Sequence, residues 1–188
     1  MADIDKSLIA TKLLWVDLEM TGLNPEKDVI LEIAAEVTDF NFKTLGNYEA
    51  RVKHDKQTVI PLFQANNWYR DKFPENRDDF IKTLDSAKPS EQVENEMVDF
   101  VTQHFGNEPA ILAGNSIHND RNFIRFWWPA FDLKLHYRML DVSAWKIFMQ
   151  AKFGVDFDKK EVHRAFDDIQ ASIAELQFYL DWFNKNKQ

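Results

Sequence analysis

The chain has 188 residues, and its 31 acidic and 23 basic residues give it a net charge of −8. It has no cysteine, which excludes a disulfide scaffold, a thiolate zinc site and a cysteine nucleophile. A protein that wraps long nucleic acid by charge alone is usually basic, so any nucleic-acid substrate should be short or be met through bound cations. The length and the 26 aromatic residues (16 Phe, 6 Trp and 4 Tyr) predict one well-packed domain over residues 1–188, with its core at about 12–184.

The ends and the apolar runs bear on location. The N-terminal residues lack a basic stretch followed by an apolar one, and no window approaches the roughly 18 consecutive apolar residues of a membrane span. We therefore expect a cytoplasmic protein that makes no membrane contact.

The first part of the chain predicts three consecutive strands. Residues 12–18 form a short apolar run, which is typical of a strand buried on both faces. A second strand is expected over 29–38 and, after a turn at 41–46, a third over 47–53. Three strands in succession indicate a β-meander. From about residue 58 the pattern changes.

A helix and a short strand follow the third strand. Ser90 is a suitable N-cap, apolar residues from Val93 to Val101 recur on one helical face, and Gly106 ends the helix. Residues 110–113 then form a short apolar run that predicts a buried strand.

The last third of the chain alternates helices with one strand. We expect a helix over about 119–128 that stops at Pro129, a strand over 139–142 and a helix to about Phe153. Apolar residues spaced three and four apart over 166–183 predict the final helix. The whole pattern indicates an α/β fold, a sheet with helices on both faces.

Two carboxylates stand at the end of the first strand. Asp17 and Glu19 are two residues apart, and on a strand such residues project to the same face, roughly 6.5–7 Å apart. The two charges repel each other unless a cation lies between them. The alternative is an ordinary solvated strand end.

Asp120 lies just after a second apolar strand, at 110–113. The carboxyl ends of strands are where open α/β sheets place their ligands. The alternative is a charge that stabilises the N-terminus of the following helix.

The start of the last helix supplies a histidine and two aspartates. His163 precedes the helix and Asp168 lies in its first turns, so at a spacing of five both can face one point. Asp168 also borders the core residue Ile169, so we expect Asp168 to turn inward and Asp167 to lie on the surface. Each residue alone is more often structural or solvated.

Four hard oxygen donors and one neutral imidazole suit Mg²⁺ or Mn²⁺ rather than zinc. Two such ions about 3.5–4 Å apart can hold the attacking and leaving oxygens of a phosphoryl displacement. The imidazole of His163 then serves as general base for the water, since an unperturbed histidine titrates at about pH 6.5. Cations rather than lysines would then meet the phosphate, which agrees with the acidic net charge.

These five residues, in this order, resemble the DEDDh 3′→5′ exonucleases, which have a ribonuclease H-like fold. Within them the chain is similar to the oligoribonucleases, which cut short RNA fragments to mononucleotides. The resemblance covers about 12–183, and the strings that carry it are residues 15–23, 114–117, 137–143 and 163–165. Residues 70–76, Asn122 and Ala144 depart from the family pattern.

The resemblance implies a ribonuclease H-like mixed five-stranded sheet with helices on both faces. It also implies a 3′→5′ exoribonuclease that degrades short oligoribonucleotides to mononucleotides by two-metal-ion hydrolysis. The metal ligands would be Asp17, Glu19, Asp120 and Asp168, and the base would be His163.

The resemblance assigns substrate contacts as well. It implies that Leu18 and Trp68 flank the terminal bases and that Ser116 helps cap the 5′ phosphate. A cap would explain a preference for short substrates, because it blocks the passage of longer chains. Stacking on Trp68 would contribute roughly 1–3 kcal/mol per base; the alternative is a partly buried packing tryptophan.

A homodimer is the last implication. The resemblance places Tyr137 and Arg138 in the neighbouring protomer's active site, Tyr137 as a catalytic residue, and makes Ser143 a further substrate-binding candidate. By themselves Tyr137 and Arg138 could be an ordinary strand start. The apolar and aromatic residues of 123–131 are expected to support the interface; the alternative is a thick intramolecular core.

Two other functions stay open. A proofreading-type DNA exonuclease of the same family would not need Tyr137 and Arg138 from a partner. A catalytically silent nucleic-acid-binding module would have the same fold, but a complete carboxylate set with His163 argues against it.

Overall fold

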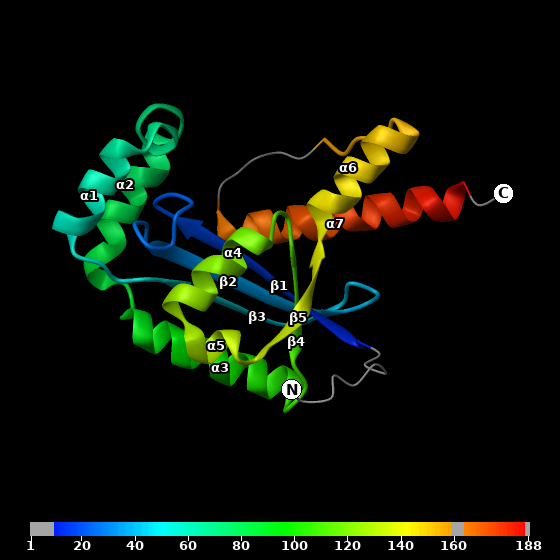
Figure 1. The fold of residues 1–188 in the computed structure, drawn as a ribbon, viewed down its shortest axis with the longest axis horizontal. Coiled ribbons are helices and arrows are strands. Elements are labelled where there is room, and N and C mark those ends of the chain that lie inside the picture. Colours follow the sequence, from blue (N-terminus) through cyan, green and yellow to red (C-terminus); the bar gives the residue numbers. More distant parts are fainter. Residues whose placement is uncertain (1–9, 159–163, 187–188) are drawn as a thin grey trace.

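The computed structural model describes residues 10–158 and 164–186. Its centre is a five-stranded sheet with the strand order β3-β2-β1-β4-β5. The strands are β1 (Lys12–Met20), β2 (Ile30–Asp39), β3 (Thr44–Arg51), β4 (Ala110–Gly114) and β5 (Leu135–Asp141). The pairs β1–β2 and β2–β3 are antiparallel, and β1–β4 and β4–β5 are parallel. The sheet is therefore mixed, as predicted, and Figure 1 shows β1 at its centre.

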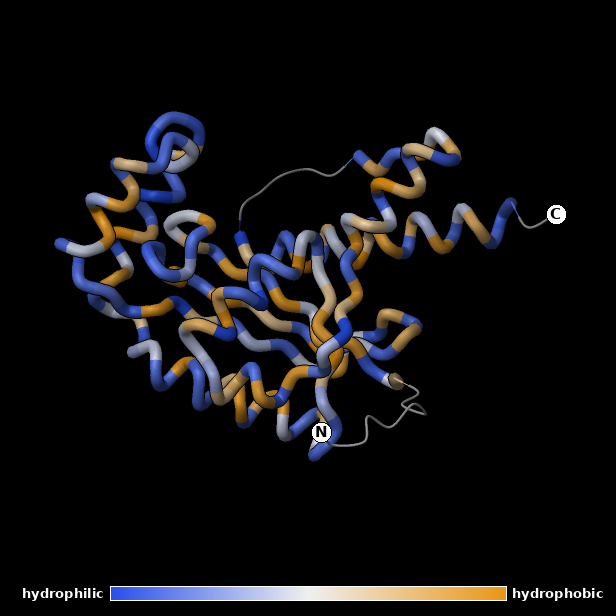
Figure 2. The backbone as a smooth tube through the Cα atoms, in the orientation of Figure 1, coloured by the Kyte–Doolittle hydropathy of each residue, from blue (hydrophilic) through white to orange (hydrophobic). Residues whose placement is uncertain are grey.

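Helices lie on both faces of this sheet (Figure 1). The helical elements are α1 (Lys56–Ala65), η1 (Trp68–Lys72), α2 (Pro74–Thr83), η2 (Leu84–Ser86), α3 (Ser90–Phe105), α4 (His118–Trp127), α5 (Pro129–Asp132), α6 (Val142–Phe153) and α7 (Ala165–Lys185). Hydrophobic residues concentrate in the sheet and on the helix faces that cover it (Figure 2). The predicted fold class is thus confirmed.

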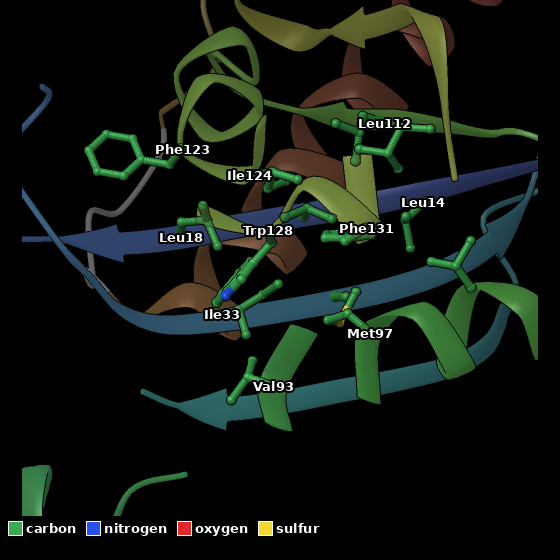
Figure 3. Close-up of a cluster of buried hydrophobic side chains, with 14 of the residues drawn as sticks. Leu14, Leu18, Ile33, Val93, Met97, Leu112, Phe123, Ile124, Trp128 and Phe131 are labelled. Atoms are coloured by element: carbon green, nitrogen blue, oxygen red, sulfur yellow. The ribbon is translucent and has the colours of Figure 1, made fainter. Parts of the chain in front are cut away.

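The alternation along β1 assigns its side chains to two cores. Leu14 and Leu18 pack with α3, α4 and α5 on one face (Figure 3). Leu13 and Trp15 pack with α6 and α7 on the other face. Because side chains alternate along a strand, Asp17 and Glu19 continue the row of Leu13 and Trp15 and face the α7 side.

The segment 56–86 forms a third packing unit, which we call the α1–α2 lobe. Phe63, Tyr69 and Phe80 pack there with Val29, which directly precedes β2, and with Leu31 at its start. Figure 1 shows the lobe at one end of the sheet. The sequence indicated a change of pattern here but did not predict these helices.

The ends of several elements differ from prediction. Strand β3 begins at Thr44 rather than 47, because Asp39 accepts hydrogen bonds from the backbone of Asn41 and Lys43 and closes a tighter turn. Strand β5 begins at Leu135 rather than 139, since its parallel pairing with β4 already starts at Leu135.

The prediction that Ser90 caps α3 is wrong by one position. Pro89 is the cap residue, and its carbonyl accepts the N–H of Val93 at 3.1 Å. The Ser90 hydroxyl instead accepts the indole N–H of Trp128 at 2.9 Å. The predicted stop of α4 before Pro129 is confirmed, because α4 ends at Trp127 and Pro129 begins α5.

The apolar cluster at 123–131 is mainly intramolecular core. Phe123, Ile124, Trp128 and Phe131 are fully buried against α3 and the sheet. The expectation that these four support a subunit interface is therefore wrong, because α3 supplies the second cover. Phe126 is half exposed.

Across residues 10–158 and 164–186, none of the helices combines the length and the apolar character needed to cross a bilayer.

Candidate active site

Three carboxylates converge between the central strand and the last helix. Asp17 and Glu19 project from β1 toward α7, and Asp168 projects back from the first turns of α7. One oxygen from each of the three lies within 4.8 Å of the others. We call this group the acidic cluster; its spacing suits a shared cation.

Glu19 is a strongly perturbed member of the acidic cluster. Its side chain is buried, and this burial raises its pKa to about 8, helped by the charges of Asp168 and Glu32. The hydroxyl of Tyr69 donates to Glu19 Oε2 at 3.4 Å and acts in the opposite direction. Such a carboxylate is costly to ionise by itself, so a cation held here would relieve the cost.

The helical period places Asp168 in the cluster. Asp168 and its neighbour Ile169 are buried, whereas Asp167 is exposed, as the sequence predicted. The N–H of Asp168 donates to the carbonyl of Arg164 at 2.9 Å, which fixes the first turn of α7.

Asp120 lies next to this group without belonging to it. It is buried in the first turn of α4, and its Oδ1 accepts the N–H of Leu18 at 2.9 Å. Leu18 stands between Asp17 and Glu19, so Asp120 contacts the strand at the acidic cluster. Burial raises the pKa of Asp120 to about 7, and the charge of Asp141 adds to the rise.

His163, the predicted general base, lies outside the described residues. Its neighbour Arg164 is the N-cap residue of α7.

A cavity of about 320 Å³ opens beside Glu19. Its lining residues are Leu18, Glu19, Met20, Gly22, Leu23, Asn66, Trp68 and Tyr69. Trp68 packs edge-on against Tyr69, with ring centroids 4.6 Å apart, and remains partly exposed. Leu18 belongs to two environments. It packs in the core formed with α3, α4 and α5, and it also lines this cavity. The structure thus brings Leu18 and Trp68 together at the acidic cluster.

Tyr69 is a site residue that the sequence analysis missed. It follows Trp68 directly, but its sequence separation from Glu19 is 50 residues, and no local pattern joins the two. Burial raises the pKa of Tyr69 well above its usual value, so the phenol stays protonated and can donate.

Ser116 and Ser143 meet at the carboxyl end of β4. Their hydroxyls are 3.2 Å apart, and the N–H of Ser116 donates to Ser143 Oγ and to Asp141 Oδ1, both at 3.0 Å. Asp141 also caps α6 by accepting the N–H of Ser143. Ser116 has a φ of 50°, a left-handed conformation that is uncommon outside glycine and that these bonds stabilise.

Tyr137 and Arg138 are exposed on β5, the edge strand beyond β4. The Arg138 guanidinium lies over the Tyr137 ring, 5.1 Å from its centroid. Both face solvent from an edge of the sheet rather than joining the acidic cluster on β1 and α7.

Comparisons of the sequence agree on one family. The pattern of the exonuclease family (RNase_T) matches residues 14–176. A probable oligoribonuclease of Caenorhabditis elegans is 39% identical over 174 residues, which cover 91% of this chain and 88% of that protein. An oligoribonuclease of Francisella tularensis subsp. novicida is 37% identical over 171 residues, which cover 90% and 94% respectively.

Solved structures share the fold at low sequence identity. Exonuclease I from Methylocaldum szegediense superposes with a TM-score of 0.63 at 13% identity, over 94% of this chain. E. coli exonuclease I in complex with a dT13 oligonucleotide gives 0.57 at 12% identity, over 95% of this chain. This chain spans 43% and 44% of those two longer chains, so the likeness concerns the fold alone.

The fold and the acidic cluster are those of a nuclease hydrolase, and the donor set of the cluster suits a divalent metal. The chain belongs to the exonuclease family and, within it, to the oligoribonucleases. The resemblance drawn from the sequence motifs is thereby confirmed, and the family supports 3′→5′ exoribonuclease activity by the two-metal mechanism typical of it.

Proposed function

We propose that this chain degrades short oligoribonucleotides to mononucleotides from their 3′ ends, with two Mg²⁺ or Mn²⁺ ions. The observation that carries the proposal is that Glu19 of the acidic cluster and Trp68 line the same cavity. A scissile phosphate at the carboxylates would place a neighbouring base against the indole. The names of the relatives at 37–39% identity support an RNA substrate. Cytoplasmic location stays a prediction.

The donor set fits hard divalent cations. The ligands would be the carboxylates of Asp17, Glu19 and Asp168, with Asp120 beside them, and carboxylate oxygens are what Mg²⁺ and Mn²⁺ prefer. Bound cations would supply a more acidic water and offset the charge of the phosphate. The raised pKa of Glu19 supports this fit, because the buried carboxylate needs a positive charge to ionise at neutral pH.

The protein's own groups would do the rest. His163 would accept the proton of the attacking water, and the Tyr69 hydroxyl would hold Glu19 in one orientation. Trp68 and Leu18 would flank the terminal bases, and Ser116 with Ser143 would bind the 5′ phosphate.

We extend the proposal to a homodimer in which Tyr137 and Arg138 complete the partner's active site. Their exposure on the edge strand β5 supports this, since such a strand can present side chains to a second copy. Mixing inactive Asp120→Ala with inactive Tyr137→Ala protein should return about a quarter of the wild-type rate, because about half the dimers are mixed and each has one complete site. No recovery after verified exchange of subunits would remove Tyr137 from the catalytic residues.

The test of function is a cleavage assay with Mn²⁺ and end-labelled RNA of roughly 2 to 20 nucleotides. Asp168→Asn should lose more than about 100-fold in rate, since it removes one charge from the acidic cluster. Asp167→Asn is the matched control, because its side chain is exposed one position away. Equal loss in both variants, or activity without divalent metal, would contradict the proposal. DNA of the same lengths tests the alternative of a proofreading-type DNA exonuclease.

A further inference from the structure

Two arginines and two carboxylates form an ion-pair group beside the acidic cluster. Asp79 Oδ2 accepts from Arg51 Nη2 at 2.7 Å and from Arg164 Nη2 at 2.5 Å. Arg51 Nε also donates to Glu32 Oε2 at 2.9 Å, and Arg164 Nη1 lies 3.9 Å from the same oxygen. We call Glu32, Arg51, Asp79 and Arg164 the arginine clamp.

The arginine clamp contacts both elements that bear the acidic cluster. Glu32 on β2 is directly opposite Glu19 on β1 in the strand register. The backbone carbonyl of Arg164 accepts the N–H of Asp168 in the first turn of α7. Arg164 therefore links the side-chain bonds of the clamp to the start of this helix. A shift of Arg164 would therefore move Asp168 relative to Glu19.

The arginine clamp also holds the α1–α2 lobe. Asp79 lies on α2, and the ring of its neighbour Phe80 lies under both guanidiniums, with centroid distances of 5.3 Å and 5.6 Å. Phe80 packs against Tyr69, which donates to Glu19. Figure 1 shows α2 and the first turn of α7 at the same end of the sheet.

Arg164 depends on these partners. Its Nη1 atom is buried and has no hydrogen-bond partner, so Glu32 and Asp79 supply the negative charge around it. A buried guanidinium nitrogen without such compensation is unfavourable. Without Asp79 the guanidinium would have to move, and the start of α7 would move with it.

We propose that Asp79 is a positioning residue that holds Arg164, and through it the start of α7, so that Asp168 faces Glu19 at the distance the cations require. This inference rests on the proposed function, because it assigns the arginine clamp a role in the proposed metal site. The clamp also holds the lobe, which carries Trp68, beside the acidic cluster.

A merely structural role would have a different signature. The side chain of Asp79 is 38% exposed, and ion pairs at such positions contribute little to global stability. Groups that orient metal-binding side chains, by contrast, typically change metal affinity by 10–100-fold when they are removed. We therefore expect a loss of metal affinity that greatly exceeds any loss of thermal stability.

The test uses Asp79→Asn, which keeps the size of the side chain and removes its charge. Mn²⁺ affinity, measured by calorimetry, should fall by roughly tenfold, and amide exchange should speed up over 165–170. Asp78→Asn is the matched control, because Asp78 is exposed on the same helix and pairs with its neighbour Arg77. It should leave both measurements unchanged.

Arg164→Gln should reproduce the loss of affinity, and the double variant should lose no more than about what either single variant loses. Wild-type Mn²⁺ affinity in Asp79→Asn, or equal losses in Asp79→Asn and Asp78→Asn, would overturn the inference. Calorimetry does not depend on turnover. A wild-type protein that binds Mn²⁺ but leaves RNA intact would contradict the proposed function, while the difference between the two aspartate variants would still support the positioning role.

Discussion

The acidic cluster and the α1–α2 lobe meet at Glu19, yet they are built in different ways. The acidic cluster lies between two central elements, β1 and α7, which contribute to one hydrophobic core. The lobe is attached at one end of the sheet, by the packing of Phe63 and Tyr69 on the start of β2 and by the arginine clamp.

This difference separates two tasks. Chemistry at a phosphate needs carboxylates held rigidly, and the central strand with the last helix provides that. The side of the cavity that contacts bases of different sizes can be formed by a smaller packing unit, such as the lobe, with fewer contacts to the rest of the fold. Substitutions in the cluster should therefore affect turnover, and substitution of Trp68, which lines the cavity from the lobe, should mainly affect substrate binding.

Asp17→Ala should have the largest effect. It removes one carboxylate from the acidic cluster, so turnover should fall by more than about 100-fold. Thermal stability without metal should hold or rise, because the remaining carboxylates repel each other less. The measurements are initial rates with saturating Mn²⁺ and melting in a chelator. Retention of more than about a tenth of the wild-type rate would show that Asp17 is not a required ligand.

Trp68→Ala should have a smaller effect of a different kind. Loss of a stacking surface costs roughly 1–3 kcal/mol per base, so KM for a dinucleotide should rise about 5- to 150-fold while kcat changes less. Trp68→Phe keeps an aromatic ring in the cavity and is the matched control. An unchanged KM would mean that Trp68 serves the lobe by packing on Tyr69 and Phe73.

The same two regions also differ in how far the sequence predicts them: the acidic cluster was predicted, and the lobe was not. Alternation along β1 places Asp17 and Glu19 on one face, and the helical period turns Asp168 inward and Asp167 outward. Both patterns are local, so they can be read without the fold. The family motifs then imply that the carboxylates of β1 and the one at the start of α7 belong to one site.

The lobe could not be predicted in this way. Tyr69 reaches Glu19 across 50 residues, and Asp79 reaches Arg164 across 85. Neither pair shares a period or a motif, because their contacts follow from tertiary packing. The misplaced cap at Ser90 has the same cause, since a distant indole, that of Trp128, takes its hydroxyl.

Tyr69→Phe tests the contact between the two regions, because this hydroxyl donates a hydrogen bond from the lobe to Glu19 of the acidic cluster. The bond favours the ionised form of Glu19, so its loss should raise the pKa of that carboxyl further. Half-saturating Mg²⁺ should rise severalfold at about pH 7 and less at about pH 9, where Glu19 ionises in both proteins. The control is Tyr179→Phe, which removes a similar bond to Glu175 on the far part of α7. Equal shifts at both pH values would contradict this account.

The smallest expected effect is the pH dependence of stability in the metal-free protein. The pKa of Glu19 is about 8 in the folded state against an ordinary value of 4.5, so between these values the folded state binds the extra proton. Stability is then full below about pH 4.5 and falls as pH rises toward about 8.

Asp120, with a pKa of about 7, acts in the same direction. His54 acts oppositely below about pH 6.5, because burial lowers its pKa, so the clearest window is about pH 6.5 to 9. One pKa unit corresponds to about 1.4 kcal/mol, and each kcal/mol moves the melting temperature of a chain this size by about 2–4 °C. Melting in a chelator should therefore drop by a few degrees across the window. Glu19→Gln should flatten the curve, whereas Glu91→Gln, at an exposed position on α3, should leave it unchanged. If the melting temperature of Glu19→Gln dropped by as much as that of the wild type over this pH window, the pH dependence would come from groups other than Glu19.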